Sequence, residues 1–154
     1  MTNEAVCAEV IERVLIRETL EKYLGSLDDK DWEGIADCFT EDAISHYNNE
    51  PETLQGGVGV ATWLHRMVAY DATDHSLSNA RIKVDGDTAE AHSIVMATLH
   101  QGTEGIGRVQ VRGIDYKDKL VKINGEWKIR ERLHRPTMQY DALSQSKVLY
   151  SGNK

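Results

Sequence analysis

The chain lacks the features of a membrane protein, a secreted protein or a disulfide-stabilised domain. No apolar run approaches the roughly 20 residues that cross a bilayer, and no basic-then-apolar leader opens the sequence. Only two cysteines, Cys7 and Cys38, occur in 154 residues, and they form no CxxC pair. We therefore expect a cytoplasmic protein that meets no membrane and keeps its thiols buried or unreactive.

An excess of positive charge is missing too, because the formal net charge at pH 7 is −7. Proteins that bind nucleic-acid phosphates need a basic face, so we expect no nucleic-acid partner. No HExxH or three-ligand spacing is present, which argues against a metal site. The length is that of a single domain, which buries about 68–70% of its unfolded surface and needs no covalent staple.

Helices are expected first along the chain and strands later. Apolar residues recur at spacings of three and four over residues 4–27, 32–39 and 60–68, which predicts three helices. A short strand is expected near residues 43–47, and the chain beyond Asp74 reads as antiparallel strands joined by tight turns at "VDGD" and "ING". The pattern predicts an α+β domain over residues 1–136, with three helices on one face of a curved antiparallel sheet.

Asp28 stands one residue beyond Leu27, where the apolar stripe of the first helix ends. Its carboxylate can belong to a helix end and cap the next helix, a role that Asp29 or Asp31 can also take. Alternatively, it can point into a cavity. A strongly twisted sheet wrapped around helices leaves a cone-shaped hollow at its open end, and such a pocket can hold a few polar groups between apolar walls.

The order of these segments resembles a known family. A helix, "LDDKDWEGIADCFTEDA", a strand, a histidine at the start of the sheet, "DGDTAEAH" and "INGEWKIRER" follow one another as in the SnoaL-like branch of the nuclear-transport-factor-2-like superfamily. The resemblance covers residues 8–136 and is closest to the scytalone dehydratase type, with bile-acid dehydratases and hexachlorocyclohexane dehydrochlorinases as neighbours. It implies a cone-shaped α+β barrel, a cofactor-independent lyase and a homo-oligomer, either a dimer or a trimer.

The resemblance further implies that His75 is a general base oriented by Asp28. A neutral imidazole can remove a carbon-bound proton, and a carboxylate at its other nitrogen fixes the tautomer and stabilises the imidazolium. Tyr47 and His100 stand at the separations of the scytalone dehydratase pattern, where the tyrosine polarises the substrate carbonyl and the histidine assists the departing hydroxyl. Structural alternatives remain open: a surface-loop role for His75, an ordinary strand position for Tyr47 and a solvated strand end for His100.

Substrate contacts are expected from Tyr23, Tyr116, Arg135 and Trp63. Tyr23 matches the tyrosine of the bile-acid dehydratase motif Y-x4-D and can replace a tyrosine that scytalone dehydratase has in place of Leu27. Tyr116 falls at the position of a family asparagine. Arg112, Arg132 or Arg135 can supply the cation that the dehydratases and dehydrochlorinases use near the carbonyl or leaving group.

Other candidates are given structural roles. Alternation along "EWKIRERLHR" places Trp127, Ile129 and Leu133 on one face and Arg130 and Arg132 on the other, so we expect Arg132 to be solvated. The remaining histidines, which have no partner at an informative spacing, are expected to be structural or at the surface; they are His46, His65, His92 and His134.

The sequence thus predicts a dehydratase acting on a small, largely apolar, cyclic hydroxyketone. The same His/Asp pair would equally serve a ketosteroid-isomerase-like isomerase, a polyketide cyclase or a dehydrochlorinase, and a ligand-binding module of the same fold needs no such pair. Residues 137–154 form a C-terminal tail that is expected to be either a frayed terminus or a flap over the pocket.

Overall fold

The structure, a computed structural model, describes residues 2–48, 50–102 and 106–144. Three helices and six strands follow in the order α1 (Asn3–Asp29), α2 (Trp32–Asp37), β1 (Phe39–Tyr47), β2 (Leu54–Gln55), α3 (Gly56–Leu64), a 3-10 turn η1 (His65–Ala69), β3 (Ala72–Asp85), β4 (Thr88–Gln101), β5 (Gly107–Ile123) and β6 (Glu126–Ser144). The predicted third helix therefore begins earlier than expected and ends as a 3-10 turn.

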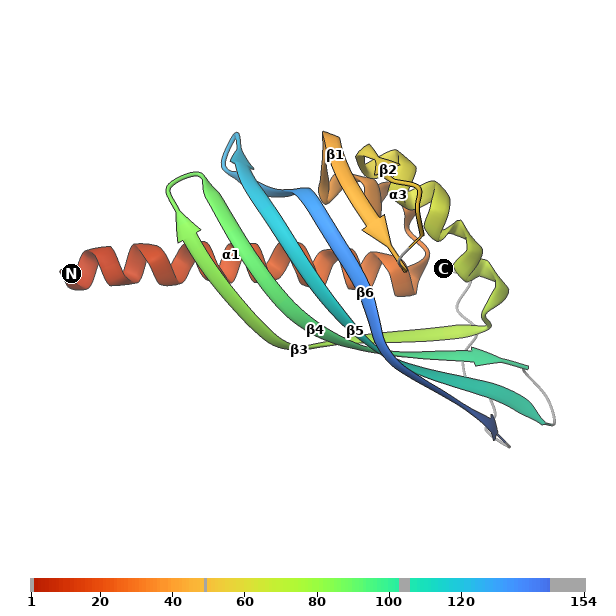
Figure 1. The fold of residues 1–154 in the computed structure, drawn as a ribbon. Helices are drawn as coiled ribbons and strands as arrows, with labels where there is room; N and C mark the ends of the chain where they lie inside the picture. Colours follow the sequence, from red (N-terminus) through yellow and green to blue (C-terminus); the bar gives the residue numbers. More distant parts are fainter. Residues whose placement is uncertain (1, 49, 103–105, 145–154) are drawn as a thin grey trace.

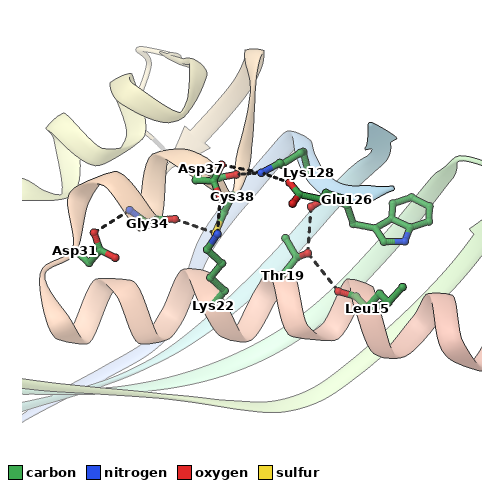
Figure 2. Close-up of polar contacts among 10 residues, drawn as sticks. Leu15, Thr19, Lys22, Asp31, Gly34, Asp37, Cys38, Glu126 and Lys128 are labelled. Carbon is green, nitrogen blue, oxygen red and sulfur yellow. Dashed lines mark hydrogen bonds and ion pairs between the residues drawn. The ribbon is translucent and has the colours of Figure 1, made fainter. Parts of the chain in front are cut away.

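The capping residues answer the question about Asp28. Helix α1 ends where Lys30 adopts the left-handed conformation, with φ of 58°. Asp31, not Asp28, caps α2, because its side chain accepts a hydrogen bond from the Gly34 N–H at 2.9 Å (Figure 2). Asp28 lies in the last turn of α1, and its carboxylate is bonded to strand β3 instead.

The sheet has the strand order β2-β1-β6-β5-β4-β3. All neighbouring strands are antiparallel except β1 and β6, which run parallel, so the sheet is mixed and not wholly antiparallel as predicted. The long strands bend midway, α1 crosses one arm of the sheet, and α3 lies beside β1 (Figure 1). Only the C-terminal half of α1, from Ile16 to Leu27, buries its apolar stripe.

Strand β6 is longer than the sequence suggested. The last strand was expected to end near residue 136, yet its pairing with β5 continues to Ser144, opposite Gly107. Residues 137–144 of the predicted tail are therefore part of the sheet. Residues 145–154, on which the predicted flap also depends, lie outside the described residues.

One irregularity in β6 determines which side chains face the helices. Lys119 pairs with Glu131, but its neighbour Leu120 pairs with Ile129, so Arg130 is an extra residue in the ladder. Such a bulge shifts the alternation by one residue. Ile129 is buried before the bulge, and the even-numbered residues Arg132 and His134 are buried after it.

Polar contacts fasten α2 between α1 and β6. The carboxylate of Asp37 pairs with Lys22 of α1 and with Lys128 of β6 (Figure 2). Thr19 of α1 donates its hydroxyl hydrogen to the carbonyl of Trp127 at 3.1 Å. No helix in the described part of the chain is long and apolar enough to cross a membrane.

Candidate active site

A pocket of about 300 Å³ lies between the end of α1, the segment α3–η1 and the inner face of the sheet. Its walls are mainly apolar and aromatic, with a few polar groups. The lining residues are Tyr23, Leu27, Asn48, Trp63, Leu64, Arg66, Met67, Ala69, Tyr70, His75, Ala97, Leu99, Arg112, Ile114, Tyr116 and His134. A larger groove of about 770 Å³ lies on the outer face of the sheet, but the predicted acid–base pair is absent from its lining. The inner pocket is therefore the candidate site.

Asp28 and His75 are in direct contact at the wall of this pocket. Oδ1 of Asp28 is 2.6 Å from Nδ1 of His75, and Oδ2 accepts the backbone N–H of His75 at 2.8 Å. The Thr73 hydroxyl donates to Oδ1 at 2.8 Å. The His75 side chain is 4% exposed and that of Asp28 is 25% exposed. Three hydrogen bonds thus hold the carboxylate in place against β3.

This contact assigns the two nitrogens of the imidazole. An ionised carboxylate only accepts hydrogen bonds, so Nδ1 of His75 carries the hydrogen and Nε2 is the basic nitrogen. His75 lines the pocket, and Nε2 is the ring nitrogen that is not engaged by Asp28. The arrangement can remove a proton from a ligand and stabilise the resulting imidazolium.

Three buried tyrosines, Tyr23, Tyr47 and Tyr116, form a cluster at the pocket, and two of them line it. The hydroxyls of Tyr23 and Tyr47 are 3.0 Å apart, and the rings of Tyr23 and Tyr116 meet edge to face. Burial raises the pKa of all three hydroxyls well above the ordinary value, so each is a neutral hydrogen-bond donor near neutral pH. Tyr23 and Tyr116 line the pocket as predicted, whereas Tyr47 is absent from the lining and contacts Tyr23 from behind.

Arg132 lies behind the tyrosines and is not solvated, which corrects the prediction from alternation. Its Nε and Nη2 donate to the two carboxylate oxygens of Asp118 at 2.7 and 2.8 Å, and both side chains are buried. Its guanidinium lies 4.2 Å from the ring centre of Tyr23 and 4.5 Å from that of Tyr116. Because Arg130 is an extra residue in the ladder, Arg132 faces inward, where its guanidinium packs against the tyrosine cluster.

His134 is a pocket residue that sequence reasoning missed. It is 8% exposed and stacks on Tyr47, with ring centres 4.7 Å apart. Its Nδ1 is buried and has no hydrogen-bond partner among the described residues. Burial, reinforced by the positive charge of Arg132, lowers the pKa of His134 from 6.5 to about 3, so the imidazole is neutral. His134 faces inward because of the bulge at Arg130, and no local sequence signal marks that bulge.

Trp63 lines the pocket as predicted. Its indole N–H donates to Glu50 at 3.0 Å, and the guanidinium of Arg66 lies 3.9 Å from its ring centre. Arg66 also pairs with Glu50 at 3.5 Å. This small network forms the α3–η1 side of the pocket.

Two predicted site residues lie on the opposite face of the sheet. The alternation of β4 is unbroken, so Ala97 and Leu99 face the pocket while His100 faces away. Arg135 follows His134 and also faces outward, where its Nη2 donates to Asp115 at 2.9 Å and its side chain is 47% exposed. The structure therefore contradicts a place in the pocket for His100 and Arg135.

The chain is similar to known proteins over most of its length. A family model described as a SnoaL-like domain matches residues 8–133. An uncharacterized protein of Mycobacterium tuberculosis (strain ATCC 25618 / H37Rv) is 26% identical over 140 residues, which cover 86% of this chain and 90% of that protein.

Solved structures extend this likeness to the fold. A protein of Novosphingobium aromaticivorans that is provisionally named a scytalone dehydratase superposes with a TM-score of 0.77, at 24% identity over 96% of this chain and 99% of that chain. A hexachlorocyclohexane dehydrochlorinase of Novosphingobium barchaimii gives a TM-score of 0.74, at 17% identity over 87% and 92% of the two chains. At these identities the superpositions establish a common α+β fold, as the sequence predicted.

Proposed function

The chain belongs to the SnoaL-like domain family, and from its pocket we propose that it is a cofactor-independent lyase that eliminates water from a small cyclic hydroxyketone. One observation carries this proposal: Nδ1 of His75 lies 2.6 Å from Asp28 in the wall of the inner pocket. A carboxylate in that position keeps the other imidazole nitrogen basic. The provisional name of one structural neighbour and the dehydrochlorinase name of another support an elimination.

The proposed reaction begins with proton removal. Nε2 of His75 takes the proton from the carbon beside the carbonyl, and the electron pair of that C–H bond moves onto the carbonyl oxygen as an enolate. Asp28 stabilises the imidazolium that forms. In this proposal, Tyr23 and Tyr116, neutral donors whose side chains line the pocket, stabilise the enolate oxygen. Tyr47 acts as a positioning residue, because its hydroxyl bonds to that of Tyr23.

Loss of the hydroxyl completes the elimination. The enolate electrons form the carbon–carbon double bond as the C–O bond at the β-carbon breaks. The imidazolium of His75 returns its proton to the departing hydroxide, which leaves as water. The substrate becomes an unsaturated ketone, and His75 is neutral again. No step requires His100, which faces away from the pocket.

The test is solvent-deuterium exchange at the α-carbon of cyclic ketones and hydroxyketones. We expect His75→Gln and Asp28→Asn each to slow exchange and elimination by about 10²–10⁴-fold, the usual contribution of a general base. His100→Gln is the matched control, because it removes the same ring from the outer face, and it should retain wild-type rates. Unchanged exchange in the two dyad variants would remove His75 from the mechanism.

Product analysis separates elimination from the alternatives that use the same base. Isomerisation or cyclisation leaves the mass of the substrate unchanged, whereas dehydration lowers it by one water. A chlorinated substrate analogue tests halide elimination in the same assay. If a ligand binds in the pocket but neither exchanges nor reacts, the protein is a small-ligand-binding module and the lyase proposal is wrong.

A further inference from the structure

Arg112 is a half-buried cation in the pocket that a neutral group holds in place. It lies on β5, and its Nη2 donates to the side-chain oxygen of Gln110 at 3.3 Å. The same oxygen accepts the hydroxyl hydrogen of Tyr70 at 2.8 Å. The Nε of Arg112 is buried and has no hydrogen-bond partner among the described residues. The guanidinium thus has a hydrogen bond to a neutral side chain, while its Nε–H is unpaired among the described residues.

The charge of Arg112 is not balanced within the pocket. No aspartate or glutamate is among the described lining residues, and no acid lies within ion-pair distance of Arg112 in the described part of the chain. Arg66, the other arginine of the lining, pairs with Glu50. Arg108, on the same strand as Arg112, pairs with Asp141. A half-buried charge without a counter-charge is costly, and a bound anion would offset that cost.

The other titratable groups around Arg112 limit the charge of such an anion. The pKa of His134 is lowered to about 3, mainly by burial and by Arg132 and also by Arg112, so this imidazole adds no second positive charge. Asp28 lies behind His75, where its carboxylate is already bonded to His75 and Thr73. One uncompensated cation fits one negative charge, and a cavity of about 300 Å³ is at the small end of ligand pockets.

Building on the proposed function, we propose that the substrate carries a carboxylate that Arg112 binds, so that the enzyme acts on a small cyclic hydroxyketo acid. A guanidinium presents parallel N–H donors that match the two oxygens of a carboxylate. Gln110 and Tyr70 preorganise the guanidinium for this contact. Arg112 thereby orients the ring so that the carbon beside its ketone approaches His75.

A pair of uncharged and charged probes tests this directly. Titration calorimetry of the full chain compares 4-oxocyclohexane-1-carboxylate with 4-oxocyclohexane-1-carboxamide, which has nearly the same shape. We expect the wild type to bind the carboxylate at least tenfold more tightly. Arg112→Gln should bind both probes with the affinity of the wild type for the amide. Arg108→Gln, which removes the same charge from the same strand, should keep the preference.

The wild-type comparison is decisive even if Arg112→Gln does not fold. Equal affinities for the two probes, or no binding of the carboxylate, overturn the proposal, and so does a preference that persists in Arg112→Gln. Deuterium exchange on both probes separates this inference from the lyase proposal. Exchange that depends on His75 without a carboxylate preference refutes only the role of Arg112, whereas a preference without exchange of any ketone refutes only the lyase.

Discussion

Replacing His134 with glutamine tests whether the protein keeps this imidazole neutral where it packs against the buried tyrosines. His134 is 8% exposed, stacks on Tyr47 and faces the charges of Arg132 and Arg112 as well as His75. Burial comes first among the causes that lower its pKa from 6.5 to about 3, and the charge of Arg132 comes second. The variant keeps a polar side chain of similar length but cannot take up a proton.

The sign and size of the effect follow from proton linkage. In the unfolded chain the histidine binds a proton near pH 6.5, but in the folded protein it stays neutral until about pH 3. The unfolded state therefore binds more protons between these values, and the folded state loses stability as the pH falls below 6.5. Each pH unit in that range is worth about 1.4 kcal/mol, so acidification from pH 7 to pH 5 costs about 2 kcal/mol through His134.

The assay is urea unfolding at pH 7 and pH 5, from which the free energy of unfolding is extrapolated. The wild type should lose about 2 kcal/mol more than His134→Gln over this interval. His100→Gln, a histidine change on the outer face, should behave like the wild type. The lowered pKa of Asp37, about 2, acts below this interval, since the ordinary value is 3.8. Equal losses in the wild type and His134→Gln would show that His134 is not held neutral.

Two further predictions concern buried groups. Arg132→Met leaves the carboxylate of Asp118 buried without its partner, so the free energy of unfolding should fall by about 3–5 kcal/mol. The double variant that also carries Asp118→Leu should regain most of this stability. An Arg132→Met variant as stable as the wild type would contradict the buried pair. Burial raises the pKa of the Cys38 thiol to about 11, whereas Cys7 is exposed. A thiol reagent at pH 8 should therefore label one cysteine in the native protein and two in denaturant, and rapid native labelling of Cys38 would refute the burial.

The end of α1 shows what local sequence could predict. Apolar spacing located the buried stripe, and the step from Leu27 to Asp28 marked the point where polar groups begin. The spacing left open which acid caps α2, and the structure assigns that role to Asp31. The contact between Asp28 and His75 was expected from the family resemblance and is present in the fold. Its catalytic role stays a prediction until exchange is measured.

Local sequence could not predict which side chains of β6 face the pocket. Arg130 and Glu131 are both charged, so nothing in the local pattern shows that one of them is an extra residue. The bulge depends on pairing with two other strands, since β5 shifts register between Lys119 and Leu120 and β1 shifts along the same part of β6. A shift of one residue exchanges the two faces of a strand, which is why Arg132 was assigned to the wrong side.

His100 shows the limit of carrying spacing from one family member to another. The number of residues between two positions does not determine which face of a strand each side chain lies on. Equal spacing in two proteins places a side chain in the pocket in both only if their strands have bulges at the same positions. In this chain β4 alternates without interruption through Leu99, which faces the pocket, so His100 faces outward. The inward polar groups come instead from β5 and from β6 beyond its bulge. Arg112 on β5 and His134 on β6 therefore line the pocket that His100 does not reach.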